Sequence, residues 1–309
     1  MRVIKKLLKL IGILFLVIVL MMMSAVVLLC YAFYKASAVP EDYTGEIPTG
    51  GAIEATYLAN GACDVSHQEV KTEDKAIKKY EIWYPSELVT ENKKYPVVVV
   101  VNGTGVFATK AAPLFEHLAS WGFIVIGNQD PSTWSGQSTD RTLSWLLAEN
   151  ERSDSLFYGK VDLEHIGITG HSQGGVGVFN AITKNEHREM YQCAVSLSPP
   201  EKKIAEMLRI PYDSSQTRIP LLLLAGTEND VITQKGMREI YDELSVNRVM
   251  ARRAGTGHGE MLYSADGYVT AWFMWLLKND SQAKKAFIGD RPELSENVLY
   301  QDKRIDISE

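Results

Sequence analysis

The stretch Gly170-His171-Ser172-Gln173-Gly174-Gly175 decides the fold that this sequence predicts. Residues 164–169 before it are typical of a buried strand, and residues 176–182 after it indicate the start of a helix. A serine in a Gly-x-Ser-x-Gly pattern between a strand and a helix is the mark of a nucleophile elbow, which holds the hydroxyl out at the edge of a sheet. Gly170 and Gly174 leave room for that tight turn. Ser172 is therefore the candidate nucleophile.

Apolar runs alternate with helical patterns on both sides of the elbow. Pro96–Val101 is uniformly apolar, as expected of a strand buried on both faces. Further strands are expected at residues 123–126, 165–169, 193–197, 219–225 and 246–251, the last of the sheet, with helices at 107–121, 139–147, 235–244 and 265–277. This alternation predicts an α/β fold with a mostly parallel, doubly wound sheet. Upstream, residues 52–58, 68–70 and 78–84 are expected to form strands of an antiparallel edge.

The N-terminal segment is unlike the rest of the chain. A window of about 25 residues between Lys9 and Lys35 carries no charge, and a membrane-spanning helix needs roughly 20. Four of the first nine residues are basic, which favours a cytoplasmic N-terminus. Residues 1–35 are therefore predicted to be a basic stub followed by one transmembrane anchor, with everything after them outside the cytoplasm. Residues 36–38 (Ala-Ser-Ala) leave open the alternative of cleavage near Ala38 and secretion.

The remaining chain is long enough for one large α/β domain. We expect a linker over residues 36–51, the domain over 52–290 and a C-terminal tail over 291–309. The net charge of −6 is spread without basic blocks, so no nucleic-acid surface is expected. No Cys/His spacing suggests a metal site. Cys63 and Cys193 fit either a disulfide or two separate thiols.

A serine nucleophile needs a base, and the base needs an acid to orient it. In a fold with this kind of elbow, the acid and then the histidine follow the serine in the chain. Asp230, just after the strand expected at 219–225, is the candidate acid, and Glu228 is the alternative. His258 lies in a glycine-rich loop after the last expected strand and is the candidate base, whereas His187 lies in a polar surface loop. For His171 we expect a packing or pocket-wall role.

The oxyanion of a tetrahedral intermediate needs two N–H donors held in advance. One is expected to be the backbone N–H of Gln173, directly after the candidate nucleophile. The other should come from the loop after the strand at 96–101, where the N–H of Thr104 is the first choice and Gly105 or Val106 are the neighbouring alternatives.

Several separated stretches resemble one known family in the right order. They are residues 97–105, 117–125, 158–175, 228–230 and 257–258, within a region from about residue 80 to 280. The chain resembles the polyester hydrolase and cutinase-like branch of the α/β-hydrolases, near dienelactone-hydrolase-like and platelet-activating-factor acetylhydrolase-type enzymes. The resemblance implies the α/β-hydrolase fold with Ser172 as nucleophile, Asp230 as acid and His258 as base.

The sequence departs from that family at three places. Asn102-Gly103 stands where the family commonly has His-Gly, Thr104 where polyester hydrolases carry an aromatic residue, and Ser198-Pro199-Pro200 where they carry a tryptophan. The missing aromatic pair argues against an aromatic polyester and favours a smaller or aliphatic ester.

Together these observations predict a membrane-anchored, extracytoplasmic serine hydrolase that cleaves carboxylic esters through an acyl-enzyme, with no cofactor. Two alternatives stay open. An acyltransferase would use the same triad with another acceptor, and a non-catalytic anchored binding protein would use the same fold without turnover. The sequence leaves the oligomeric state undetermined.

Overall fold

The structure, a computed structural model, describes residues 11–24 and 39–308 of the 309-residue chain. The chain divides into two units, Met1–Ala38 and Val39–Glu309. In the first unit, residues 11–24 are helical. Among the described residues, no helix has both the length and the apolar character needed to cross a membrane. The rest of the predicted anchor, residues 1–10 and 25–35, lies outside the described residues.

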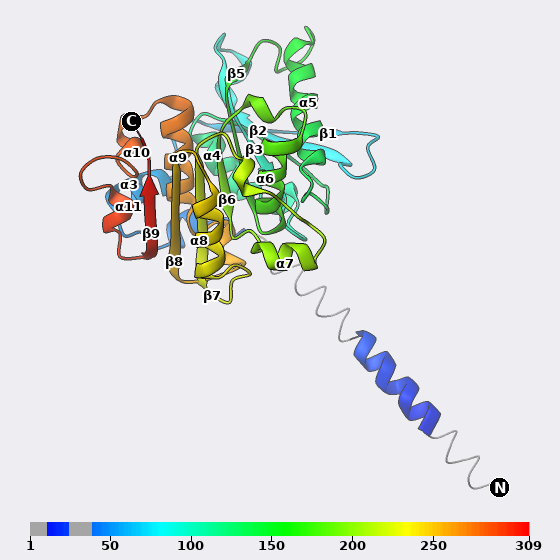
Figure 1. The fold of residues 1–309 in the computed structure, drawn as a ribbon. Coiled ribbons are helices and arrows are strands. Elements are labelled where there is room, and N and C mark those ends of the chain that lie inside the picture. Colours follow the sequence, from blue (N-terminus) through cyan, green and yellow to red (C-terminus); the bar gives the residue numbers. More distant parts are fainter. Residues whose placement is uncertain (1–10, 25–38, 309) are drawn as a thin grey trace, which may run out of the picture. The chain divides into compact units, whose positions relative to one another are not determined.

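The second unit is organised around a nine-stranded sheet with the order β1-β2-β4-β3-β5-β6-β7-β8-β9 (Figure 1). Strands β4, β3, β5, β6, β7 and β8 pair in parallel, while β1 and β2 at one edge and β9 at the other are antiparallel. Their bounds are β1 (Val65–Lys71), β2 (Lys79–Pro85), β3 (Tyr95–Val101), β4 (Ile124–Asn128), β5 (Val161–His171), β6 (Tyr191–Leu197), β7 (Leu221–Glu228), β8 (Arg248–Gly257) and β9 (Tyr300–Asp306). The predicted mostly parallel sheet with an antiparallel edge is confirmed.

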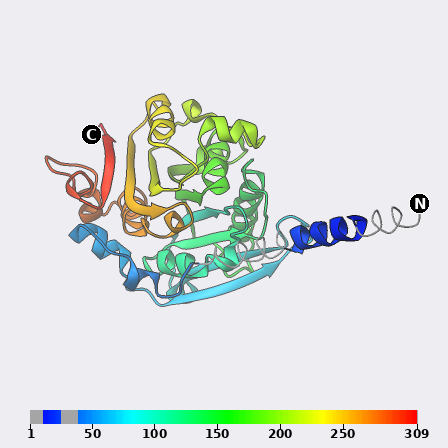
Figure 2. The same ribbon diagram turned by 90° about the horizontal axis from the view of Figure 1, so that it is seen from below.

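Helices cover both faces of this sheet (Figures 1 and 2). Those described in the second unit are α2 (Tyr43–Glu46), α3 (Ala52–Leu58), α4 (Ala112–Ser120), α5 (Gln137–Glu151), α6 (Gln173–Lys184), α7 (Lys202–Met207), α8 (Gln234–Glu243), α9 (Asp266–Lys278), α10 (Ser281–Lys284) and α11 (Glu293–Glu296). One apolar core joins α3, α4 and α9 to the sheet, and a second joins α5, α6 and α8 to it.

Strand β3 shows why the sheet is doubly wound. Its valines are buried on both sides, with Val98 and Val100 in the core under α4 and α9, and Val97 and Val99 in the core under α5 and α6. The chain moves outward in one direction from β3 and in the other from β5, so the order of the strands reverses between these two neighbours. Ligands of such sheets bind outside the carboxyl ends of the strands at this point.

Residues 52–58, predicted to be a strand, form the helix α3 instead. The side chains it buries, Ile53, Glu54, Tyr57 and Leu58, follow helical spacing. The N–H groups of Ile53 and Glu54 donate to the carboxylate of Glu293, at 2.7 and 2.8 Å. That carboxylate caps the N-terminus of the helix from a position far along the chain, which a local pattern cannot reveal.

The compact unit extends beyond the domain expected at residues 52–290 in both directions. Within the expected linker, Val39 and Tyr43 are buried in the core under α4 and α9. Within the expected tail, β9 pairs with β8, so the strand expected at residues 246–251 is not the last of the sheet. Residues 39–308 therefore belong to one compact unit. Cys63 and Cys193 are both free thiols.

A buried ion pair connects the two ends of the domain. The guanidinium of Arg253 on β8 donates to the carboxylate of Glu54 on α3 at 2.8 Å, and both side chains are at most 4% exposed. The hydroxyl of Tyr300 on β9 contacts both partners, and Asn297 donates to Glu54 at 2.7 Å. Helix α3 and the C-terminal segment therefore lie side by side (Figures 1 and 2), and both contact the buried pair of Arg253 and Glu54.

Replacing Glu54 by glutamine should lower the free energy of unfolding by about 3 kcal/mol, because the charge of Arg253 stays buried without a compensating carboxylate. Urea denaturation measures the change. Glu164→Gln, at an exposed position on β5, is the matched control and should change it by less than about 0.5 kcal/mol. Equal midpoints for the two variants would contradict a structural role for this pair.

Candidate active site

Ser172 lies at the sharp turn from β5 into α6, with a positive φ of 58° and a ψ of −121°. The turn is possible because Gly170 and Gly174, two residues away on either side of Ser172, have no side chains. A Cβ at Gly170 would lie 2.5 Å from the carbonyl oxygen of Gly174, and one at Gly174 would lie 2.2 Å from that of Val101. These contacts exclude every residue but glycine at both positions. The geometry is that of a nucleophile elbow.

Three side chains from different strand ends form a hydrogen-bonded chain at this elbow. Nε2 of His258 lies 2.9 Å from Oγ of Ser172, and Nδ1 of His258 lies 2.9 Å from Oδ1 of Asp230. A carboxylate only accepts, so Nδ1 carries the proton and Nε2 is free to accept from the serine hydroxyl. The structure thus brings together the three residues chosen from the sequence, while Glu228, the alternative acid, is exposed at the end of β7.

The Asp230 carboxylate is buried, with 1% of its side chain exposed, and is saturated with donors. Oδ1 accepts from His258 and from the N–H of Val231, and Oδ2 accepts from the N–H of Gly226 and the hydroxyl of Ser198. Burial alone would raise the pKa of Asp230, but the hydrogen bonds from His258, Ser198 and Gly226 outweigh it and hold the pKa below its ordinary value. Asp230 therefore stays ionised beside the imidazole.

His171, next to Ser172 in sequence, holds the main chain of His258. Its ring is buried and its Nε2–H donates to the carbonyl oxygen of His258 at 2.7 Å, while the two rings lie 4.7 Å apart. Burial, together with the nearby His258, lowers the pKa of His171 to about 3, so its ring is neutral. The sequence predicted that His171 packs in the interior or lines the wall of the pocket. It did not predict the hydrogen bond from His171 to the main chain of His258.

The loop after β3 forms a tight turn beside the elbow. The N–H of Val106 donates to the carbonyl oxygen of Gly103 at 3.1 Å, and Gly105 takes a φ of 73°, which places Thr104 at the exposed tip. This turn packs against β5, since a Cβ at Gly103 would lie 3.0 Å from the carbonyl oxygen of His171. The N–H of Thr104 is thereby held near the start of α6.

The Gln173 side chain connects the elbow to this turn. Its Nε2 donates to the Thr104 hydroxyl at 3.3 Å, and its Oε1 accepts from the N–H of Thr133 at 2.9 Å. The Thr133 hydroxyl in turn donates to the carbonyl oxygen of Asn102 at 2.6 Å. Only the backbone of Gln173 entered the sequence argument, so this polar bridge and Thr133 were missed.

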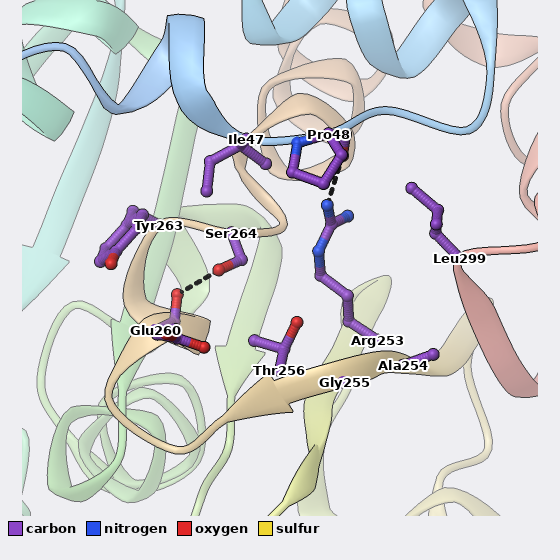
Figure 3. Close-up of a pocket in the computed structure, with 10 residues that line it drawn as sticks. All are labelled: Ile47, Pro48, Arg253, Ala254, Gly255, Thr256, Glu260, Tyr263, Ser264 and Leu299. Carbon is purple, nitrogen blue, oxygen red and sulfur yellow. Dashed lines mark hydrogen bonds between the residues drawn. The ribbon is translucent and has the colours of Figure 1, made fainter.

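The loop that carries His258 is fixed from its other side by hydrogen bonds. Gly255 N–H donates to the Thr227 hydroxyl at 2.9 Å, and Gly257 N–H donates to the Glu260 carboxylate at 3.2 Å. Gly255, Thr256 and Glu260 also line a pocket of about 260 Å³. In this pocket Ser264 donates to the carbonyl oxygen of Glu260, and Arg253 donates to that of Pro48 (Figure 3). The residues lining this pocket include none of the three at the elbow. Among residues 11–24 and 39–308, no group of three or more His, Cys, Asp and Glu side chains is placed to hold a metal ion.

Comparison with known proteins assigns the chain to a class. Residues 37–302 match the PET hydrolase-like family, and the chain belongs to that family.

Individual relatives are distant. The chain is similar to a bis(hydroxyethyl) terephthalate hydrolase of Streptomyces coelicolor, with 29% identity over 159 residues that cover 50% of this chain and 48% of the relative. It is also similar to cutinase 1 of Thermobifida cellulosilytica, with 25% identity over 77% of this chain and 87% of the relative. Chlorophyllase type 0 of Chenopodium album shares 23% identity over 64% and 67%. The match thus spans about half the length of the first of these relatives.

The neutral ring of His171 should make the stability of the protein depend on pH. Between pH 8 and pH 5 the unfolded chain takes up a proton at this histidine, whose ordinary pKa is about 6.5, and the native state does not. Because the pKa of His171 is lower in the folded state than in the unfolded state, the free energy of unfolding decreases as the pH is lowered. At pH 5 this group accounts for a loss of about 2 kcal/mol.

His171→Gln keeps an N–H donor without a titrating ring. From pH 8 to pH 5 the free energy of unfolding of this variant should therefore decrease by about 2 kcal/mol less than that of the wild type. Urea denaturation at the two pH values measures the difference. Identical pH dependence of the two proteins would show that the ring of His171 is not held neutral.

Proposed function

We propose that the protein is a serine hydrolase that cleaves carboxylic esters with Ser172 as nucleophile, His258 as general base and Asp230 as the orienting acid. The observation that carries the proposal is the hydrogen-bonded chain from Ser172 through His258 to Asp230 at a nucleophile elbow. Membership of the PET hydrolase-like family supports an ester as substrate.

The proposed reaction has two halves. Oγ of Ser172 attacks the ester carbonyl carbon while its proton passes to Nε2 of His258, and the tetrahedral intermediate collapses when the imidazolium returns that proton to the departing alkoxide. A water molecule then attacks the acyl-enzyme, His258 takes its proton, and the carboxylic acid leaves as Ser172 recovers its hydrogen. Asp230 keeps the imidazole in the required tautomer and stabilises its charged form.

The backbone N–H groups of Gln173 and Thr104 are the proposed donors to the oxyanion. Gln173 is the first residue of α6, where the helix dipole adds to the attraction for negative charge. The hydrogen bond between the Gln173 side chain and the Thr104 hydroxyl supports this assignment, because it holds the two residues next to each other. Removing such a donor costs about 100-fold or more in turnover in comparable sites.

The proposed substrate is a small or aliphatic ester rather than an aromatic polyester. Thr104 and the stretch Ser198-Pro199-Pro200 stand where the polyester hydrolases that this chain resembles carry aromatic side chains. In the structure Pro200 is buried, and its carbonyl oxygen accepts from the hydroxyl of Tyr212 at 3.0 Å. Neither Thr104 nor that stretch offers an aromatic ring to clamp an aromatic group.

We further propose that residues 1–35 anchor the protein in the membrane with the catalytic domain outside the cytoplasm. The charge-free window between Lys9 and Lys35 supports this proposal, as do the helix over residues 11–24 and the exposed apolar side chains along it, among them Leu14, Phe15 and Leu16.

Full-length protein should stay in the membrane pellet after alkaline carbonate extraction of cells that express it, because a helix inserted in the bilayer resists that treatment. Immunoblotting of the fractions makes the measurement. A soluble product that begins after Ala38, identified by N-terminal sequencing, would overturn the anchor and support cleavage.

Ser172→Ala should abolish hydrolysis of p-nitrophenyl butyrate, with a loss of at least about 1,000-fold in kcat and an unchanged thermal midpoint, because the substitution removes only the attacking oxygen. Ser172→Ala should also lose labelling by a fluorophosphonate probe that marks the wild type. Retained turnover in the folded variant would refute the role of Ser172. Labelling without any ester turnover in the wild type would favour a different acyl acceptor.

A further inference from the structure

Ser198 is the first residue after β6, and its side chain is directed at the acid of the proposed triad. The residue is fully buried, its N–H donates to the carbonyl oxygen of Leu224 at 2.8 Å, and its Oγ donates to Oδ2 of Asp230 at 2.6 Å. A hydroxyl bound to a carboxylate at this distance makes a strong, charge-assisted hydrogen bond. Ser198 therefore contacts the triad but does not belong to it.

The backbone of Ser198 adopts a conformation that its sequence disfavours. Its φ is 43°, in the left-handed region that residues with a Cβ rarely occupy. The next residue is Pro199, which by itself would push Ser198 toward an extended backbone. Seven described non-glycine residues have positive φ. Three of them lie at the triad: Ser172 belongs to it, Ser198 donates to Asp230, and Asn229 precedes Asp230 in the sequence. Strain gathered in this way points to function rather than to folding.

The bond from Ser198 fixes how the carboxylate of Asp230 is rotated. Each oxygen has two donors, and Ser198 and the N–H of Gly226 hold Oδ2, while Oδ1 faces Val231 and His258. Without the hydroxyl, Oδ2 keeps one donor, and the plane of the carboxylate is free to turn away from Nδ1 of His258. The hydrogen bond from Nδ1 of His258 to Asp230 is then weaker, and this bond fixes the tautomer of the imidazole and its distance from Ser172.

We propose that Ser198 is a positioning residue for the reaction, and that its hydroxyl orients the Asp230 carboxylate and shares its negative charge. This inference rests on the ester hydrolysis proposed above. The hydroxyl donates its hydrogen bond to Asp230 and not to the serine nucleophile, so its effect on the chemistry passes through Asp230 and His258.

The charge-sharing part of the role predicts a change in the pH profile. Asp230 faces His258, and His258 faces the neutral ring of His171 on β5 and the Ser172 hydroxyl, while the Glu260 carboxylate accepts from the N–H of Gly257, the residue before His258. With one donor fewer, Asp230 attracts the protonated imidazole more strongly. The unprotonated form that accepts the serine proton is then reached only at higher pH, so the acid limb of kcat/KM moves upward in pH.

Three variants separate this role from a structural one. Ser198→Ala and Ser198→Gly both remove the hydroxyl, but glycine also relieves the positive φ and keeps the fold stable. Ser196→Ala is the matched control, since Ser196 is a fully buried serine two residues earlier, within β6, whose Oγ donates to the carbonyl oxygen of Gly175 instead. Measurements are the pH dependence of kcat and KM for p-nitrophenyl butyrate and the rate of fluorophosphonate labelling.

Both Ser198 variants should lower kcat and the labelling rate about tenfold with KM unchanged, as expected for loss of one hydrogen bond to a charged group. Their acid limbs should move to higher pH, and Ser196→Ala should match the wild type. The positioning role would be overturned if Ser198→Gly matched an active wild type in both turnover and labelling rate. A loss of rate in the Ser198 variants without any change in the pH profile would also overturn it. Absence of ester turnover and of labelling in the wild type would instead overturn the proposed function.

Discussion

The close contact between α6 and the end of β3 is the constraint on which the site depends. Gly174 approaches the carbonyl oxygen of Val101 so closely that a Cβ would lie 2.2 Å from it. The turn that carries Thr104 begins two residues after Val101, at Gly103, and Ser172 lies directly before α6. One contact between backbones therefore sets the separation of the serine from the turn, and any larger residue at Gly174 would move both together.

Most of the fold was predictable because its central elements have strong local patterns. Strand β3 is apolar throughout and buried on both faces, and the helices around it carry apolar residues at helical spacing. Helix α3 was missed because seven residues fit two periodicities, and Glu293, which decides between them, is more than 200 residues away. Strand β9 was missed because Tyr300 is its one fully buried residue and the others are largely polar.

The site divides in the same way between what a motif reveals and what only packing reveals. Ser172, Asp230 and His258 could be chosen because each ends or follows a strand and because their order along the chain is restricted. Ser198 and the side chain of Gln173 gave no such signal. A left-handed serine before a proline is not predictable from residue type, and the partners of Gln173 come from two separate loops. Orientation of the reactive groups is thus a tertiary property.

Strand β9 has a consequence for the behaviour of the molecule in a crowded solution. It pairs along β8, the last parallel strand, from Arg248 to Arg253. Without it, β8 would present a row of open N–H and C=O groups, which is a template for a strand of another molecule. Apart from Tyr300, the side chains of β9 are exposed or half-buried and mostly polar, with Lys303 and Arg304 among them, so the strand that closes the sheet is itself a poor template. The last residues of the chain thus act against self-association.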